Sequence, residues 1–116
     1  MEKTFIVKKE HGADQIGSGM LAVLSTPTLL AFMEQVAQEE GQTHCQPGES
    51  TVGIEVQLNH LKATKIGQEV HIQAQLVEQN KRILTYDIQA WEGEEKIGQA
   101  QHKRAIINVE SFLAKL

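Results

Sequence analysis

The sequence predicts an α+β fold in which one long central helix is wrapped by a curved antiparallel sheet of five to six strands. Three observations support this prediction: one broad apolar stripe at helical spacing, several stretches of alternating apolar and polar residues, and short turns between those stretches. A one-sided helix and a one-sided sheet each need a partner for their apolar faces, and each can cover the other. The length of 116 residues suits a single domain over residues 1–116.

The helix is expected to run from Pro27 to about Glu40. Ser25 and Thr26 supply a hydroxyl N-cap candidate, and proline is favoured at the first helical position because its missing N–H would be unpaired there. Gly41 is the expected end of the helix. The apolar stripe, wide enough for a largely buried helix, consists of Leu29, Leu30, Phe32, Met33, Val36 and Ala37.

Strands are expected before and after this helix. In the clearest one, residues 52–59, apolar residues alternate with polar ones and should face the core; these are Val52, Ile54, Val56 and Leu58. His60 continues their parity, so its side chain should leave the strand on the core side. The other strands are expected at 3–8, 70–76, 84–90 and 96–108, with a candidate sixth at 17–24. Short turns make the last four antiparallel neighbours, and such a sheet around one helix is the hotdog architecture.

Composition argues against several classes of protein. The net charge is −4 and adjacent bases occur only as isolated pairs, whereas nucleic-acid binders usually carry a clustered basic face. No apolar run approaches the ~20 residues that span a bilayer, and no apolar segment follows Glu2 and Lys3 as a secretory signal requires. The single cysteine, Cys45, cannot form an internal disulfide. We therefore expect a cytoplasmic protein with neither nucleic-acid nor membrane partners.

Three polar residues, Thr26, Glu34 and His60, lie where the apolar pattern would not select them. Each has an ordinary structural explanation: a hydroxyl before proline is usually an N-cap, a carboxylate beside a helix stripe is usually solvated, and a histidine at a strand end is usually hydrogen-bonded in place. Together they are what acyl hydrolysis requires, namely a base or nucleophile, a proton carrier and a positioning hydroxyl. The N–H groups of the first helical turn and the unshielded backbone of Gly53 add groups that a carbonyl can approach.

These residues occur in motifs that resemble the fluoroacetyl-CoA thioesterase family of hotdog proteins. The motifs are Ser25-Thr26-Pro27, Phe32-Met33-Glu34, Thr51-Val52-Gly53, Asn59-His60-Leu61-Lys62-Ala63-Thr64, and the tail His102-Lys103-Arg104-Ala105-Ile106-Ile107 followed by Phe112. The resemblance covers roughly residues 21–115, and the order and spacing of the motifs make it specific.

The resemblance implies hydrolysis of an acyl-CoA to a free acid and CoA, with no metal or organic cofactor. It places Thr26, Glu34 and His60 at the catalytic positions: Glu34 as nucleophile or general base, His60 as its acid–base partner, and Thr26 as a positioning hydroxyl. It also places the Gly53 backbone beside the thioester carbonyl. The further residues expected to contact substrate are Ser25, Pro27, Lys62 and Arg104, the two bases lying near the CoA phosphates. The segment 11–19 lacks the aromatic lid of the fluoroacetyl-specific enzyme, so we expect a small or medium acyl group instead.

The spacing of two candidates predicts a dimer. Thr26 and Glu34 are eight helical residues apart, about 12 Å along one axis, which is too far for a hydrogen bond between them. If they act with His60 in one site, a second protomer must complete it, so we expect a two-fold homodimer with sites at the interface. Assembly into tetramers stays open. Two other functions also stay open: a hotdog acyl-thioester dehydratase or hydratase, and a non-catalytic acyl-CoA-binding module.

Overall fold

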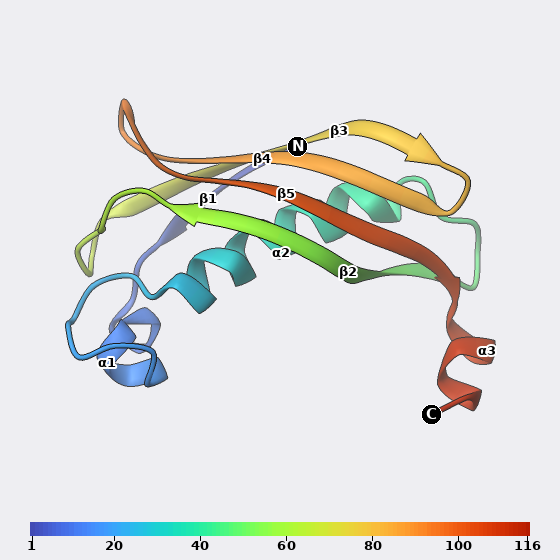
Figure 1. The fold of residues 1–116 in the computed structure, drawn as a ribbon, viewed down its shortest axis with the longest axis horizontal. Coiled ribbons are helices and arrows are strands. Elements are labelled where there is room, and N and C mark those ends of the chain that lie inside the picture. Colours follow the sequence, from blue (N-terminus) through green and yellow to red (C-terminus); the bar gives the residue numbers. More distant parts are fainter.

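A five-stranded antiparallel sheet curls over one long helix in the computed structural model, which describes residues 1–116 (Figure 1). The strands are β1 (Glu2–Ile6), β2 (Glu49–His60), β3 (Glu69–Asn80), β4 (Ile83–Glu92) and β5 (Glu95–Asn108). Their order in the sheet is β1-β3-β4-β5-β2, so β1 and β2 are its edges. The long helix is α2 (Thr26–Gln42), and the short elements are η1 (Lys9–His11), α1 (Ala13–Ile16) and α3 (Val109–Ala114). The predicted α+β hotdog architecture is confirmed.

Helix α2 lies against the concave side of the sheet because its apolar stripe matches the inner face of the strands. Its buried apolar residues are Leu29, Phe32, Met33, Val36 and Ala37. They join one cluster of 17 buried residues, to which β3, β4 and β5 also contribute. Burying side chains of this size contributes roughly 1.5–3 kcal/mol each, so this contact holds helix and sheet together.

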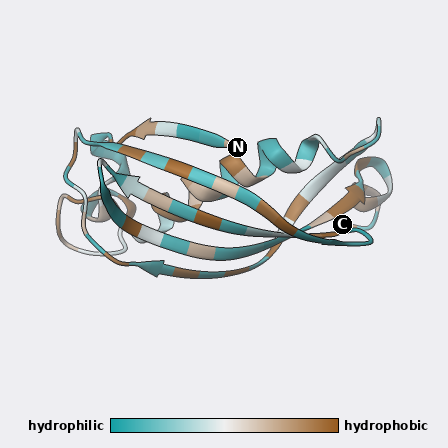
Figure 2. Cartoon of the chain, turned by 90° about the horizontal axis from the view of Figure 1, so that it is seen from above, coloured by the Kyte–Doolittle hydropathy of each residue, from teal (hydrophilic) through white to brown (hydrophobic).

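The strands alternate between a buried apolar face and a polar outer face, as Figure 2 shows by colour. In β4 the buried residues are Leu84, Tyr86, Ile88 and Ala90. The predicted alternation in 70–76 and 84–90 is confirmed. Turns with positive φ at Gly67 (95°) and Gly93 (59°) adjoin these strands, and both angles favour glycine.

Strand β2 departs from the predicted pattern because of a bulge. Its register against β5 shifts between Gly53 and Glu55. Before the bulge, Thr51 lies on the core side, opposite buried Ile106; after it, Leu58 lies there, opposite buried Ala100. The expectation that Val52 and Ile54 face the core is therefore wrong: Ile54 is the unpaired, exposed residue of the bulge, and this inserted residue reverses the parity of the strand.

Two further expectations about local structure are wrong, and one helix was not expected. Residues 17–24 form no strand; they are tied down by two isolated bridges, Gly12 to Leu24 and Val23 to Lys65. Helix α2 passes through Gly41, which is buried: a Cβ there would lie 3.2 Å from the Tyr86 hydroxyl, so this glycine serves close packing and does not end the helix. Helix α3 was not predicted.

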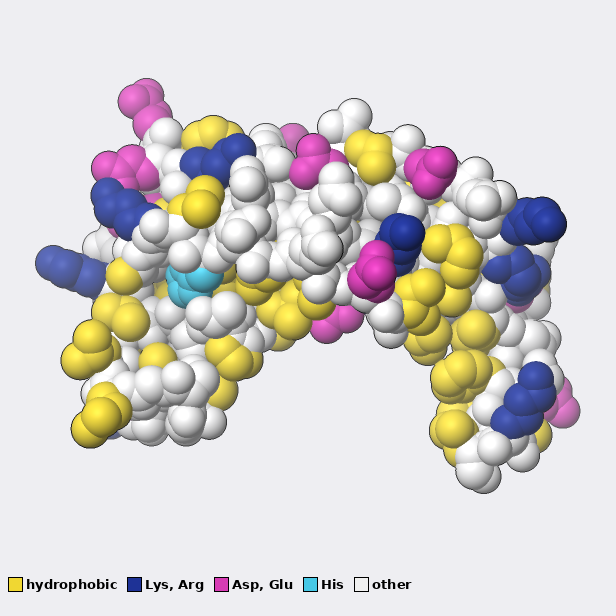
Figure 3. All heavy atoms as spheres, in the orientation of Figure 1, with side chains coloured by type: hydrophobic (Ala, Val, Ile, Leu, Met, Phe, Trp, Pro, Cys, Tyr) yellow, Lys and Arg dark blue, Asp and Glu magenta, His cyan; other side chains and the backbone are white.

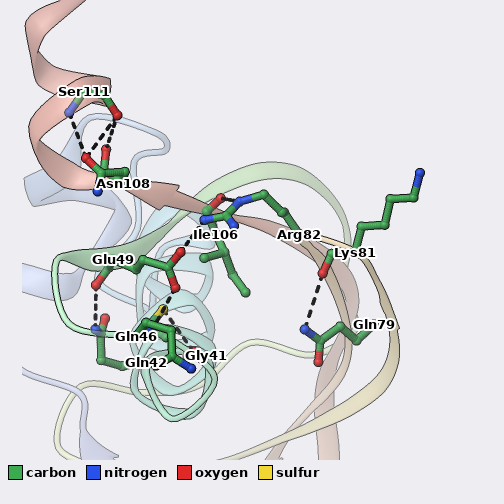
Figure 4. Close-up of polar contacts among 11 residues, drawn as sticks. Gly41, Gln42, Gln46, Glu49, Gln79, Lys81, Arg82, Ile106, Asn108 and Ser111 are labelled. Carbon is green, nitrogen blue, oxygen red and sulfur yellow. Dashed lines mark hydrogen bonds and ion pairs between the residues drawn. The ribbon is translucent and has the colours of Figure 1, made fainter.

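The end of the molecule where α2 finishes and β2 begins is held by a polar network (Figure 4). The Glu49 carboxylate accepts from Arg82 Nη2 at 2.6 Å and from the Gln46 backbone N–H at 2.8 Å. Arg82 Nε also donates to the Ile106 carbonyl at 2.9 Å. One arginine therefore connects the β3–β4 turn to β2 and β5.

The underside of the sheet is hollowed between two arms, one carrying α1 and the other α3 (Figures 1 and 3). Figure 3 shows hydrophobic side chains along this hollow and on both arms. Large exposed hydrophobic residues of the arms and of edge strand β2 are Ile16, Met20, Leu21, Ile54, Val56, Val109, Phe112, Leu113 and Leu116. Such a surface commonly marks an interaction site. None of the helices is long and apolar enough to cross a membrane.

Candidate active site

The start of α2 differs by one residue from the prediction, and this shift frees a hydroxyl. Ser25 is the N-cap: its Oγ accepts from the Thr28 backbone N–H at 3.2 Å and donates to Thr28 Oγ1 at 2.7 Å. Thr26 is therefore the first helical residue and Pro27 the second. Because Ser25 already performs the capping, the Thr26 side chain is available for another partner.

That partner is His60, at the end of β2. Thr26 Oγ1 lies 2.8 Å from His60 Nδ1, so helix start and strand end meet in one hydrogen bond. Nε2 of His60 is buried and has no hydrogen-bond partner. Burial lowers the pKa of His60, and the Lys62 backbone partly opposes this effect. The imidazole is thus held in place through Nδ1, while the enclosed Nε2 has no hydrogen-bond partner.

A hollow of about 320 Å³ adjoins this pair. Its lining residues are Ala13, Ser18, Val23, Leu24, Ser25, Thr26, His60, Leu61, Lys62 and Ala63. The segment 11–19, which carries no aromatic residue, forms one wall of this hollow through Ala13 and Ser18, and the Ala13 N–H donates to the Val23 carbonyl at 2.9 Å. That wall presents small side chains and no aromatic ring.

Glu34 lies two turns further along α2 and belongs to a second group. Its Oε2 is 3.4 Å from Arg104 Nη1 and 3.6 Å from His102 Nε2. Its side chain is 42 % exposed, whereas His102 and Arg104 are both buried. A carboxylate that reaches solvent above a buried cation is held in orientation yet remains open to an incoming molecule.

Gly53 allows Glu34 to reach the strand. A Cβ at this position would lie 2.5 Å from Glu34 Oε2 and 3.1 Å from His102 Cε1, so a side chain would occupy the space of the carboxylate. A hollow of about 280 Å³ opens here, lined by Glu34, Gly53, Ile54, Glu55, Val56 and His102. The close approach expected of the Gly53 backbone is therefore available on this side of the molecule.

Within one chain the candidates form two separate groups. The hollow beside Thr26 and His60 shares no lining residue with the hollow beside Glu34. The structure brings Thr26 and His60 together and leaves Glu34 apart, as the helical rise over eight residues requires.

The residues expected to contact substrate take different positions. Ser25 is buried and its hydroxyl is used in the cap, while Pro27 is exposed. Lys62 borders the 320 Å³ hollow and is exposed, but its ammonium is paired with Glu95.

The expectation that Arg104 meets phosphates at the surface is wrong. Its guanidinium donates to Thr51 Oγ1 at 2.9 Å, to the Thr51 carbonyl at 3.2 Å and to Glu34. Burial lowers the pKa of Arg104, and Glu34 opposes this shift. Its donors face protein acceptors, because position 104 lies on the core side of β5.

His102 is a component of this site that was not predicted from the sequence. Two signals pointed to it: His102 opens the tail motif that resembles the family, and it alternates with Ala100 and Arg104 on one face of the last strand, where all three are buried. A buried histidine without a known partner looks like a packing residue, and only the bulge in β2 reveals its contacts. No group of three or more His, Cys, Asp or Glu side chains is arranged to hold a metal ion.

Comparison with known proteins agrees with these observations. Residues 7–110 match the model of a family described as fluoroacetyl-CoA-specific thioesterase. The fluoroacetyl-CoA thioesterase of Streptantibioticus cattleyicolor is 31% identical over 94 residues, covering 81% of this chain and 68% of that protein.

Solved structures extend the comparison to three dimensions. A mutant of the fluoroacetyl-CoA-specific thioesterase in complex with fluoroacetate and CoA superposes with a TM-score of 0.92 at 26% identity, covering 99% of this chain and 94% of the other. A thioesterase-superfamily protein of Thermus thermophilus shares the fold, with a TM-score of 0.89 at 19% identity over 97% of this chain and 84% of its own. The chain therefore belongs to the fluoroacetyl-CoA-specific thioesterase family of hotdog proteins and is an acyl-CoA thioester hydrolase.

Proposed function

We propose that this thioesterase hydrolyses small or medium acyl-CoA substrates at sites that combine Thr26 and His60 of one subunit with Glu34 of its partner. The observation that supports this most directly is the hydrogen bond between Thr26 and His60, which leaves a buried, unpartnered Nε2 beside an open hollow. A buried polar atom without a partner is costly, and a bound substrate supplies one. We place this reaction in the cytoplasm, consistent with the free thiol of Cys45.

The proposed chemistry needs no group beyond these side chains and water. In one route Glu34 accepts a proton from water while the water oxygen bonds to the thioester carbonyl carbon; in the other, the carboxylate attacks and forms an anhydride that water then hydrolyses. In both, the C–S bond breaks, its electron pair stays on sulfur, and a proton completes the CoA thiol. A neutral His60 that accepts from Thr26 at Nδ1 carries its proton on Nε2, where it can donate a hydrogen bond to the carbonyl oxygen or the leaving sulfur; the proton that completes the thiol is the one that water releases, carried by Glu34 in the first route and lost in anhydride hydrolysis in the second.

The size of the hollow supports a short acyl group. Its 320 Å³ is at the lower limit of ligand pockets, and it must also receive part of the CoA arm. Fluoroacetyl-CoA is one candidate among small acyl-CoAs, but the wall at 13–18 offers no aromatic side chain to single it out.

The proposed dimer joins two copies along β2. This edge strand exposes Ile54 (52 %) and Val56 (37 %) beside the hollow that contains Glu34. Antiparallel pairing about an axis near Val56 and Gln57 would set the His60 end of one strand beside Gly53 of the partner subunit. The arm that carries α1 in one copy would then lie near the arm that carries α3 in the other, so the exposed apolar residues of both arms would be covered.

Free-thiol release from a panel of acyl-CoAs tests the function. The panel runs from acetyl- and fluoroacetyl-CoA to octanoyl-CoA, with wild type beside Glu34→Ala and His60→Ala. We expect kcat to fall about 100-fold or more in each variant. Glu39→Ala is the matched control, because it removes a carboxylate from the same helix that pairs only with Lys3. Binding of an acyl-CoA without hydrolysis would replace this proposal with the binding-module alternative.

Mixing two inactive variants tests the shared site. Glu34→Ala and His60→Ala chains are unfolded together and refolded, so that mixed dimers form. Each mixed dimer has one intact site if the site spans two chains, and activity should recover to about a quarter of wild type. Recovery is impossible if each chain carries a complete site, so an inactive mixture that contains mixed dimers would reject the shared site.

A further inference from the structure

His102 lies beneath Glu34 and has no part in the reaction described so far. It is 2 % exposed. Its Nδ1 lies 2.8 Å from the Glu55 carbonyl oxygen, and its Nε2 lies 3.1 Å from Arg104 Nη1. A carbonyl can only accept, so Nδ1 carries the proton, and the lone pair of Nε2 accepts from the guanidinium. Both ring nitrogens are therefore used inside the protein, and the ring is neutral.

The acceptor of that first hydrogen bond lies at the bulge. The register of β2 against β5 shifts between Gly53 and Glu55, and a bulge removes a residue from the regular ladder. His102 is on β5, so its ring links the carbonyl of Glu55 to the neighbouring strand. The same ring holds Arg104, which in turn contacts Glu34 Oε2 at 3.4 Å. A single side chain thus connects the bulge to the guanidinium that orients the carboxylate.

These groups leave little room for adjustment. A Cβ on Gly53 would meet Glu34, His102 and Arg104 at 2.5, 3.1 and 3.3 Å respectively. The Gly53 backbone, the imidazole and the carboxylate are thus in close contact. If the ring moves, the bulge moves relative to Glu34.

We propose that His102 is a positioning residue that sets the distance between the Gly53 backbone and the Glu34 carboxylate by tying the bulge of β2 to Arg104. This inference rests on the proposed role of Glu34. The thioester carbonyl must approach both the backbone of the bulge and the attacking or proton-accepting oxygen, and an error of about 1 Å in such spacing can cost up to ~100-fold in rate. His102 contributes through geometry alone, because neither nitrogen is free to meet substrate.

Steady-state kinetics of His102→Ala and His102→Gln test this role. We expect kcat of His102→Ala to fall roughly 10- to 100-fold with KM changed less than about twofold, because the binding hollow beside His60 is untouched. His102→Gln, which can donate to the Glu55 carbonyl or accept from Arg104, should recover part of kcat. His71→Ala is the control, because His71 is at the surface and pairs with Glu2. A His102→Ala enzyme with native circular dichroism and wild-type kcat would overturn the proposal, as would a loss confined to KM.

A measurement on the unmodified protein keeps the proposal testable if His102→Ala does not fold. Nitrogen-15 spectra of histidine-labelled protein should show His102 neutral and protonated on Nδ1 at pH 7. A proton on Nε2 instead would overturn the assignment. The Gly53 amide resonance should also move in His102→Gln and stay in place in His71→Ala. If wild type hydrolyses no acyl-CoA, the proposed function fails, whereas the spectra still decide whether His102 holds the bulge.

Discussion

Two histidines at the two hollows illustrate how the same side chain acquires different roles. His60, at the end of β2, uses Nδ1 with Thr26 and leaves Nε2 without a partner. His102, in the middle of β5, uses both nitrogens within the protein. Burial lowers the pKa of both rings, so both are neutral at neutral pH. The two rings therefore differ at Nε2. In His60 this atom has no partner and can bind substrate in the proposed reaction, whereas in His102 it accepts a hydrogen bond from Arg104.

The largest effect on kcat should come from removing the negative charge of Glu34, whose carboxylate His102 helps to position through Arg104. Glu34→Gln keeps the shape of the side chain but can neither accept a proton nor attack, so we expect kcat to fall about 100-fold or more. Arg104 then loses the only carboxylate near it, so a small change in melting temperature should accompany the loss. Thiol release and thermal unfolding measure the two effects. Glu39→Gln should change neither by much; a fully active Glu34→Gln enzyme would remove Glu34 from the chemistry.

Gly53→Ala tests whether catalysis depends on the close contact between Gly53 and the Glu34 carboxylate at the bulge. The added Cβ would displace the carboxylate, and since that is the end of a flexible side chain, the fold should survive. We expect kcat to fall roughly tenfold. The sharper readout is the double variant with Glu34→Gln: if Gly53→Ala acts by moving Glu34, it adds nothing further. Additive losses in the double variant would assign the effect to the backbone itself.

Thr26 variants test the anchoring of the first histidine. Thr26→Ala removes the partner of His60 Nδ1, which costs about 1 kcal/mol, or roughly a fivefold loss of kcat. Thr26→Ser retains the hydroxyl and should stay near wild type. Thr26→Val matches threonine in shape and should behave like Thr26→Ala. Equal activity in the serine and valine variants would show that the hydroxyl is dispensable.

The pH dependence of kcat/KM should distinguish the charge state in which His60 works. Because burial lowers its pKa below the usual 6.5, the neutral ring predominates at neutral pH, and activity should fall only as pH drops below about 6.5. His102 should add an acid sensitivity of stability in the same range: its folded pKa is depressed, so protonation favours the unfolded chain, and stability is lost as pH falls from about 6.5. Activity that instead rises toward acid would mean that a protonated His60 is the working form.

Much of the fold could be predicted from the spacing of apolar residues, because alternation in a strand and helical spacing in a helix each indicate which side is buried. That inference worked for β3 and β4, where alternation runs along the core. It failed in β2, where one inserted residue reverses the parity and no composition signal marks the insertion. Thr51 therefore lies inside, although Val52 looked the better core residue.

The candidate site was predictable in its residue types and less so in its geometry. The helix start was placed one residue late because Ser25 and Thr26 are both good caps, and only the structure shows that Ser25 makes the cap bond. Separation of Thr26 from Glu34 could be calculated from helical rise alone. The contacts of Arg104 and His102 could not, since they join strands far apart in the sequence through side-chain orientation.

The bulge in β2 also makes the site sensitive to residue count, independently of residue identity. Deleting the single residue Ile54 would let β2 run in regular register with β5, because Gly53 and Glu55 already pair with the consecutive residues Arg104 and Lys103. Leu58 and His60 would keep their pairing with Ala100 and Gly98 and their core-side orientation, but the bulge that brings the Glu55 carbonyl to His102 would be absent. A one-codon deletion in a surface-exposed edge strand, normally a tolerated kind of change, should here disturb the contact between the Gly53 backbone and Glu34 while leaving the Thr26 hydroxyl beside the His60 imidazole.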